Sequence, residues 1–149
     1  MQTALYAGSF DPFTNGHLDI VEQASKIFDK VFIAVGNNSE KQGFLPVEKR
    51  LELIKNSTLV FDNIEVVSYE GLTVEFAKHR GVNVLVRGVR NSSDFEYEKQ
   101  ITDTNRLLAP EIETILLTPR PENAYISSTI VREIYANGGD ISKFVPCVW

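Results

Sequence analysis

The sequence has few of the residues that form disulfides and no run long enough to cross a membrane. Cys147 is the only cysteine among 149 residues, so no intramolecular disulfide is possible, and we expect a reducing, cytoplasmic environment. The longest apolar runs are of the VFIAV kind at residues 31–35, far short of the ~20 residues that a membrane span requires. The start, MQTALYAGSF, has no basic segment before an apolar one, so we expect neither a signal peptide nor a membrane partner.

An excess of positive charge is also missing. The formal net charge is −5, which argues against broad nucleic-acid binding, because such proteins usually present a basic face. An acidic protein can still bind a small anion through a local cluster of positive side chains. We therefore expect no nucleic-acid partner. The net charge does not exclude small phosphorylated ligands.

The sequence does contain a regular alternation of strand-like and helical segments. Hydrophobic residues make up 43% of the chain, which is ample for one packed core, and we expect a single domain over residues 1–149. Short β-branched runs predict strands at 3–8, 31–36, 64–68, 83–88 and 112–118. Apolar residues at helical spacing predict helices at 16–28, 47–60, 72–81, 92–110 and 127–139. This alternation predicts an α/β fold: one Rossmann-like domain with a five-stranded parallel sheet and helices on both faces.

Some of these helices carry capping signals in the sequence. Ser93 followed by Glu96 has the pattern of a capping box for the fourth helix. Ser127 is expected to cap the fifth helix, and Gly138 lies near its end. The first helix is predicted to begin at Gly16.

The loops that follow the predicted strands are rich in residue types that bind phosphate. In a parallel sheet, ligands bind beyond the carboxyl ends of the strands, which here selects the loops 8–16, 36–45, 68–72, 87–92 and 118–128. The phosphate-binding types in and beside these loops are Ser9, Thr14, His17, Lys41, Arg87, Arg90, Ser127, Ser128 and Thr129. Helix starts add unpaired N–H groups, which favour an anion. We therefore expect that a polyphosphate lying across this edge could contact all five loops.

Each of these residues also has a purely structural explanation. His17 can cap or pack in a first helical turn, and Ser127 can be a plain helix cap. Arg87 and Arg90 can form surface ion pairs with the acidic residues of segment 94–96. No single residue decides the function.

Three motifs taken together resemble a known enzyme family. GSFDPFTNGH, at residues 8–17, resembles the first motif of the nucleotidyltransferase superfamily, which carries a Thr/His-x-Gly-His signature after its first strand. ISSTIVR, at residues 126–132, resembles the second motif, a serine-rich helix start that binds nucleotide phosphates. RGVRNSSDFEYE, at residues 87–98, is similar to the stretch typical of phosphopantetheine adenylyltransferases. The resemblance covers essentially the whole chain.

The resemblance implies a reaction, its ligands and an assembly. Phosphopantetheine adenylyltransferases join ATP to 4′-phosphopantetheine, giving dephospho-coenzyme A and pyrophosphate in coenzyme A biosynthesis. The resemblance therefore implies ATP and 4′-phosphopantetheine as substrates, coenzyme A as a feedback inhibitor and Mg²⁺ as a cofactor. It also implies a homohexamer.

The resemblance assigns roles to individual residues as well. His17 would stabilise the transition state at the α-phosphate of ATP. The residues placed against ATP are Ser9, Phe10, His17, Gly88, Val89, Arg90, Glu98, Asn123, Ala124, Tyr125, Ile126, Ser127, Ser128 and Thr129. The residues placed against 4′-phosphopantetheine are Ser9, Lys41, Thr73 and Arg87. No residue is assigned as a metal ligand.

The chemistry of such a transfer suits these residue types. The attacking phosphate oxygen is already anionic at neutral pH, so neither a protein nucleophile nor a strong base is needed. His17 is therefore expected to act as a hydrogen-bond donor that stabilises developing charge. Two alternatives stay open: another small-molecule nucleotidyltransferase, such as a nicotinate mononucleotide adenylyltransferase, or a nucleotide-binding sensor that does not catalyse.

Overall fold

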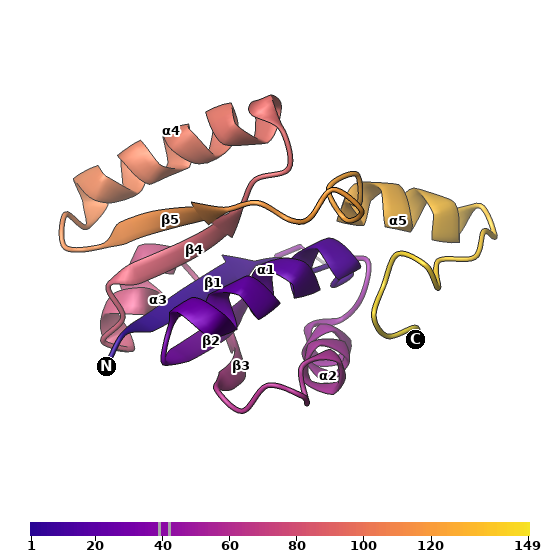
Figure 1. Ribbon diagram of the computed structural model, residues 1–149, viewed down its shortest axis with the longest axis horizontal. Helices are drawn as coiled ribbons and strands as arrows, with labels where there is room; N and C mark the ends of the chain where they lie inside the picture. The colour runs from indigo at the N-terminus through magenta and orange to yellow at the C-terminus, as the bar shows by residue number, and fades with distance from the viewer. Residues whose placement is uncertain (39, 42) are drawn as a thin grey trace.

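The protein alternates strand and helix along its length (Figure 1). The computed structural model describes residues 1–38, 40–41 and 43–149. Its strands are β1 (Thr3–Gly8), β2 (Lys30–Gly36), β3 (Ile64–Tyr69), β4 (Val84–Gly88) and β5 (Glu113–Leu117). Its helices are α1 (Asn15–Ile27), α2 (Val47–Ser57), α3 (Thr73–His79), α4 (Ser92–Leu108) and α5 (Ser128–Ala136). Within the described residues, no helix is both long and apolar enough to cross a membrane.

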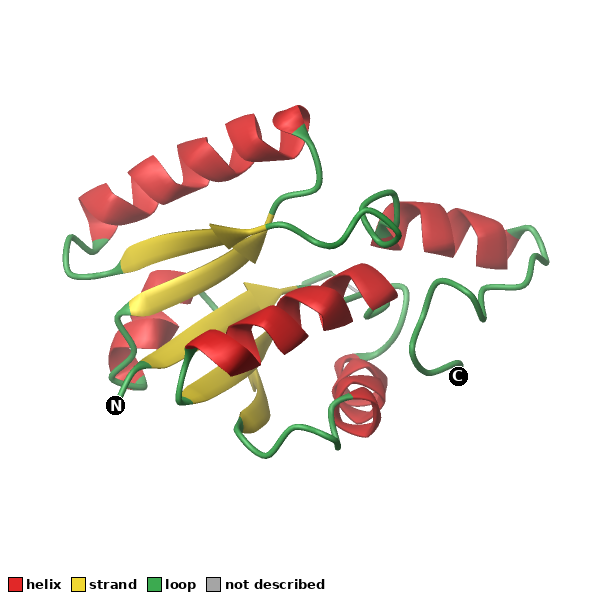
Figure 2. Ribbon diagram, viewed as in Figure 1, coloured by secondary structure: helices red, strands yellow, loops and turns green. Residues whose placement is uncertain are grey.

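The five strands form one parallel sheet in the order β3-β2-β1-β4-β5. Successive side chains of a strand point to opposite faces. Tyr6 and Ile33 therefore pack in the core beneath α1 and α2, whereas Leu5 and Phe32 pack against α3. Figure 2 shows the helices on both sides of the yellow strands. The predicted Rossmann-like fold, with five parallel strands and helices on both faces, is confirmed.

The strand order reverses at β1, and this reversal positions the site. From β1 the sheet grows through β2 to β3 on one side, and β4 and β5 are added on the other side. The carboxyl ends of β1 and β4 are therefore neighbours, and the loops that leave them separate to opposite sides of the sheet. Such a switch in strand order creates a crevice for ligands. Helix α5 lies beyond this end of the sheet (Figure 1).

Helix α1 begins at Asn15, one residue before the predicted start at Gly16. Its N-cap is Thr14, whose Oγ1 accepts the N–H of His17 at 3.3 Å. The His17 ring in turn accepts the N–H of Thr14, which completes a capping box. Histidine here fills the role that glutamate or glutamine usually has, so the sequence pattern for a capping box did not reveal it.

Helix α4 also begins differently from the prediction. Its N-cap is Asn91, whose side chain accepts the N–H of Asp94 at 3.0 Å. The predicted capping box of Ser93 and Glu96 is therefore wrong. Asparagine caps a helix as well as serine does, and Asn91 comes earlier in the chain, so the helix starts there.

Candidate active site

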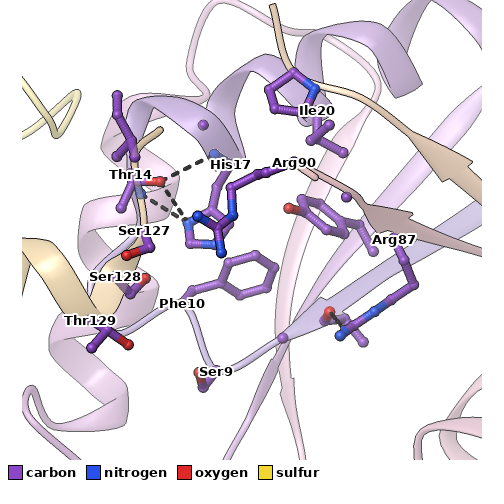
Figure 3. A pocket seen from close by; sticks show the side chains of 17 residues that line it. Ser9, Phe10, Thr14, His17, Ile20, Arg87, Arg90, Ser127, Ser128 and Thr129 are labelled. Atoms are coloured by element: carbon purple, nitrogen blue, oxygen red, sulfur yellow. Dashed lines mark hydrogen bonds between the residues drawn. The ribbon is translucent and has the colours of Figure 1, made fainter. Parts of the chain in front are cut away.

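A cavity of about 440 Å³ lies at the switch point between β1 and β4, and we call it the first cavity. Its walls come from the loops 8–16, 87–92 and 118–128 and from the starts of α1 and α5. Its lining residues are Tyr6, Ala7, Gly8, Ser9, Phe10, Thr14, Gly16, His17, Ile20, Arg87, Gly88, Arg90, Pro119, Ile126, Ser127, Ser128 and Thr129. Figure 3 shows His17, Arg90 and Phe10 gathered near its middle.

The hydrogen bonds of His17 fix which ring nitrogen carries the proton. The Thr14 N–H donates to Nδ1 of His17 at 3.0 Å (Figure 3). Because Nδ1 is the acceptor, a neutral ring must carry its proton on Nε2. The capping box of α1 therefore leaves Nε2–H as the donor that His17 offers to a ligand in the first cavity.

Aromatic packing holds the His17 ring in place. The ring meets Phe10 edge-on, with centroids 5.0 Å apart, and it stacks on Phe13 at 5.6 Å. Phe10 is buried and has a φ of +49°, which bulky residues rarely adopt. Such strained conformations persist where the surroundings over-determine them, and they cluster at functional sites.

The surroundings of His17 keep its ring neutral. Burial is the main cause and the positive charges of Arg87 and Arg90 act in the same direction, and together they lower the pKa of His17 from 6.5 to about 4. At neutral pH the ring is therefore uncharged, with its proton on Nε2. In this form the ring accepts the Thr14 N–H at Nδ1 and donates a hydrogen bond from Nε2.

The lowered pKa predicts a specific dependence of stability on pH. Between about pH 4 and 6.5 the unfolded chain protonates His17 while the folded ring stays neutral, so the unfolded state binds more protons. His17 therefore reduces the free energy of unfolding as the pH falls through this window. Urea unfolding measures this effect. Between pH 6.5 and pH 5, the free energy of unfolding should fall by about 1–2 kcal/mol more in the wild type than in His17→Gln. His79→Gln removes the other histidine, which is exposed, and serves as the control. Parallel losses in the wild type and His17→Gln would contradict the neutral ring.

Arg87, near the end of β4, is held by a carboxylate on α4. Its Nε and Nη2 groups each donate to one oxygen of Glu98 at 2.8 Å, and its Nη1 donates to the carbonyl of Ala7 at 2.7 Å. Burial alone lowers the pKa of Arg87, but the Glu98 carboxylate raises it above its ordinary value. The resemblance placed Glu98 against ATP, whereas in the structure its carboxylate contacts Arg87. Of the two arginines, only Arg90 pairs with Asp94, at 3.0 Å.

The start of α5 adds anion-binding groups to the first cavity. The Ser127 side chain caps the third N–H of the helix, at 3.2 Å. The N–H groups of Ser128 and Thr129 come before it and have no acceptor within the helix. Arg90 lines the same cavity, and Figure 3 shows its side chain reaching towards the middle of it. Because no carboxylate is among the described lining residues, the electrostatics of this cavity favour a polyphosphate.

A second cavity, of about 640 Å³, adjoins the first. Its lining residues are Gly8, Ser9, Gly36, Asn37, Asn38, Glu40, Tyr69, Glu70, Gly71 and Arg87. Gly8, Ser9 and Arg87 line both cavities. Arg87 is also the one cation in the described lining of the second cavity. Ligands in the two cavities would therefore meet beside its guanidinium group.

The predicted loops thus divide between two cavities. Loops 36–45 and 68–72 line only the second cavity, so a polyphosphate confined to the first cavity would not contact all five loops. The strand order explains the division: β2 and β3 lie on one side of β1, whereas β4 and β5 lie on the other. Residues 39 and 42 of the predicted loop lie outside the described part of the chain.

Lys41 and Thr73, which the resemblance assigns to the acceptor, are beside the second cavity but not among its described lining residues. Lys41 is exposed, and its backbone N–H donates to the carbonyl of Asn38 at 3.0 Å. The Thr73 hydroxyl forms a hydrogen bond of 2.8 Å with the hydroxyl of Tyr69. Both residues therefore contact residues that line the cavity.

Some residues assigned to ATP also lie outside the described lining of the first cavity. Val89 is buried, and its N–H donates to the end of β5. Asn123 donates a hydrogen bond to Asp19 at 3.0 Å. Ala124 follows it, and Tyr125 is 62% exposed. By contrast, the segment from Ile126 to Thr129 does line the cavity.

Among the described residues around the first cavity, no set of side chains is arranged to bind a metal ion. The described residues contain no group of three or more His, Cys, Asp or Glu side chains that could hold a metal ion. The two carboxylates nearest the arginines are engaged, since Glu98 binds Arg87 and Asp94 binds Arg90. A Mg²⁺ ion would fit here on the phosphates of a nucleotide, where it needs few protein ligands.

Two buried charged residues that hold the loops were not identified from the sequence. Arg50 donates through Nη1 to the carbonyls of Ser9 and Gly36, at 2.8 and 3.1 Å. Its Nε donates to the carbonyl of Leu45 at 3.0 Å, so one guanidinium joins the loops after β1 and β2. The other residue is Asp19, on α1. Each interrupts the apolar face of its helix, and that interruption was the signal available in the sequence.

Comparison with known proteins agrees with this architecture. A solved structure from Vibrio parahaemolyticus, named provisionally as a nicotinate-nucleotide adenylyltransferase, superposes with a TM-score of 0.67. It shares 20% sequence identity, and the match covers 97% of this chain and 94% of that chain, which shows a common fold. The sequence also matches the cytidylyltransferase-like family over residues 5–134, a range that contains the first cavity and most of the elements around it. The chain therefore belongs to the cytidylyltransferase-like family, within the nucleotidyltransferase superfamily.

Proposed function

We propose that this protein transfers the adenylyl group of ATP to the phosphate of 4′-phosphopantetheine, giving dephospho-coenzyme A and pyrophosphate. One observation carries the proposal: two cavities meet at Arg87, and the described lining of the first gathers anion-binding groups without a carboxylate. The family assignment supports nucleotidyl transfer as the class of reaction. The motif RGVRNSSDFEYE, at residues 87–98, supports the choice of acceptor.

In this proposal ATP occupies the first cavity. Its triphosphate would lie among His17, Arg90 and the free N–H groups at the start of α5. Ile20, Pro119 and Ile126 give the cavity apolar surface for the rest of the nucleotide. Such a mixture of cationic and apolar lining fits a nucleotide better than it fits a simple phosphate.

The acceptor would occupy the second cavity, with its phosphate at Arg87. The side chains of Asn37, Asn38 and Tyr69 can form hydrogen bonds with the two amide groups of the pantetheine arm. Coenzyme A contains the same arm, so we propose that it inhibits by competing for this cavity. The shared residue Arg87 would then hold the attacking phosphate beside the α-phosphate of ATP.

The transfer needs no base from the protein. A phosphate oxygen of the acceptor, already ionised, attacks the α-phosphorus, and the bond from this phosphorus to the oxygen that bridges to the β-phosphorus breaks. Pyrophosphate leaves with that oxygen and its electron pair. The Nε2–H of His17 donates to an α-phosphate oxygen as negative charge develops there. Mg²⁺ bound to ATP, as we propose, would neutralise part of the charge on the leaving group.

A comparison of two acceptors tests the proposed substrate. The Vibrio parahaemolyticus structure makes nicotinate mononucleotide the rival acceptor. Pyrophosphate release with ATP should show a kcat/KM at least about 100-fold higher for 4′-phosphopantetheine, because the second cavity offers partners for both amides of the arm. Turnover of nicotinate mononucleotide alone would overturn the proposal. No release with either acceptor would favour a nucleotide-binding sensor.

We propose that the protein assembles as a homohexamer, and the surface of α4 supports self-association. Phe95, Tyr97, Leu107 and Leu108 on this helix are 48%, 63%, 85% and 48% exposed. Exposed apolar side chains on one helix are candidates for burial between copies of the chain. Sedimentation at micromolar concentration should give about 100 kDa for six chains of 16.8 kDa.

A matched pair of variants locates this interface. Leu107→Glu should shift the hexamer towards smaller species, because it places a charge among the exposed apolar side chains of α4. Leu59→Glu changes an equally exposed leucine (79%) beyond the end of α2 and should leave the assembly intact. A wild-type monomer would contradict the hexamer.

A further inference from the structure

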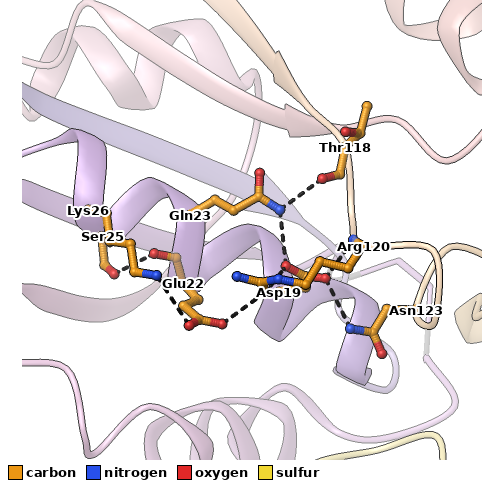
Figure 4. A network of polar contacts seen from close by, with 8 residues as sticks. All are labelled: Asp19, Glu22, Gln23, Ser25, Lys26, Thr118, Arg120 and Asn123. Atoms are coloured by element: carbon orange, nitrogen blue, oxygen red, sulfur yellow. Dashed lines mark hydrogen bonds and ion pairs between the residues drawn. The ribbon is translucent and has the colours of Figure 1, made fainter.

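A buried carboxylate connects α1, the helix that carries His17, to the loop between β5 and α5, which lines the first cavity. Asp19 lies on α1, is 3% exposed and is not among the described lining residues. Its oxygens accept the N–H and Nη1 of Arg120 at 2.7 and 2.6 Å, and Nδ2 of Asn123 and Nε2 of Gln23 at 3.0 Å each. Figure 4 shows these donors converging on Asp19. We infer that Asp19 is a positioning residue for nucleotide binding.

The loop that Asp19 holds connects β5 to α5 and forms one wall of the first cavity. Pro119 and Ile126 from this loop line the cavity, and the loop ends at the cap of α5. Gln23 adds a second connection between α1 and this loop, because its Nε2 also donates a hydrogen bond to the carbonyl of Thr118 at 2.8 Å. Three points of the loop are therefore fixed to α1. The donor on His17 and the N–H groups of α5 are thereby held in one arrangement before a ligand binds.

The charge on Asp19 is essential to this arrangement. Burial alone raises its pKa, but hydrogen bonds from Asn123, Gln23 and Arg120 outweigh burial and hold the pKa below its usual value. Gln23 and the Arg120 side chain donate to Oδ1, whereas Asn123 and the Arg120 N–H donate to Oδ2. An asparagine has one carbonyl oxygen and one NH₂ group. In either orientation, Asp19→Asn therefore turns a donor towards two other donors.

This inference rests on the proposed function, because it assumes that ATP binds in the first cavity. Without the contacts of Asp19, the loop between β5 and α5 would have to become ordered when ATP binds. The entropy lost in that ordering weakens binding. We expect Asp19→Asn to raise the Kd and the KM for ATP about tenfold. The KM for the acceptor should stay within about twofold, because the described lining of the second cavity contains no residue of loop 118–127. A mere loss of folded protein would lower the apparent kcat and leave both KM values unchanged.

The test is calorimetric titration of the whole chain with Mg-ATP alone, followed by steady-state kinetics. Asp103→Asn is the matched control, since it neutralises an exposed carboxylate that pairs with Lys99 on α4 at 2.7 Å. We expect Asp19→Asn to bind ATP about tenfold more weakly than the wild type. The control, Asp103→Asn, should bind ATP with wild-type affinity. Unchanged ATP affinity in a folded Asp19→Asn, or an equal rise in both KM values, would overturn the positioning role.

A milder variant keeps the inference testable if Asp19→Asn does not fold. Gln23→Met removes the hydrogen bond to the Thr118 carbonyl and one of the hydrogen bonds to Asp19. Gln23 is not among the described lining residues of either cavity. It should weaken ATP binding about threefold, and unchanged binding would overturn the role. A wild type that binds no ATP would overturn the proposed function itself. A wild type that binds ATP, with variants that bind it equally well, would overturn only the role of Asp19.

Discussion

Replacing His17 with alanine is expected to lower kcat about 100- to 1,000-fold while the affinity for ATP changes little. The Thr14 N–H occupies Nδ1, so the ring can offer only Nε2–H to the α-phosphate. Such a donor gains most of its strength as negative charge develops, and its loss is therefore felt mainly in the transition state. Steady-state kinetics at saturating substrates and an ATP titration give the two values.

Controls separate this catalytic role from the role of His17 in helix capping. His17→Ala also removes half of the capping box of α1, which should cost about 1 kcal/mol of stability. Circular dichroism on the same sample shows whether the variant is folded. His79→Ala removes the exposed histidine and should leave kcat unchanged. A folded His17→Ala with near-normal kcat would return His17 to a capping and packing role.

Arg87→Ala is expected to reduce both stability and acceptor binding. Glu98 is buried, and removal of its partner leaves an uncompensated carboxylate. The loss in the free energy of unfolding should be about 3 kcal/mol, at the lower end for a buried pair, because the Arg87 side chain is 29% exposed. Urea unfolding at pH 7 measures this loss.

A double variant separates stability from binding. Arg87→Met combined with Glu98→Leu removes both charges and should recover most of the stability. Its affinity for 4′-phosphopantetheine should still fall about 10- to 100-fold, because Arg87 is the one cation in the described lining of the second cavity. The affinity for ATP should fall less, because Arg90 and the start of α5 remain in the first cavity. Equal losses for the two ligands in calorimetric titration would show that Arg87 does not hold the acceptor phosphate.

The fold followed from local patterns in the sequence. Runs such as VFIAV alternate with amphipathic segments, and a chain with that alternation has few ways to bury its strands other than a parallel sheet covered by helices. The helix starts were less predictable. Thr14 and His17 form a capping box whose second member is a histidine, and Asn91 competes with Ser93 for the start of α4. Such choices depend on side-chain geometry that residue types alone do not specify.

The site was predictable at the level of loops but not of individual contacts. His17, Arg90 and the serines at the start of α5 follow from the rule that ligands bind at the carboxyl ends of parallel strands. The division into two cavities depends on the order of strands, which alternation does not specify. Long-range partners, such as Glu98 for Arg87 and loop 118–127 for Asp19, arise only when distant segments pack together.

Pyrophosphate release with ATP and 4′-phosphopantetheine, with each substrate omitted in turn, tests the central claim most directly. Adenylyl transfer between the two cavities predicts one pyrophosphate for each dephospho-coenzyme A formed, and release at background level when either substrate is left out. The dependence on the acceptor is the sharpest part of this result, because the attacking oxygen belongs to it. Equal release of pyrophosphate without 4′-phosphopantetheine, or none when both substrates are present, would contradict the account.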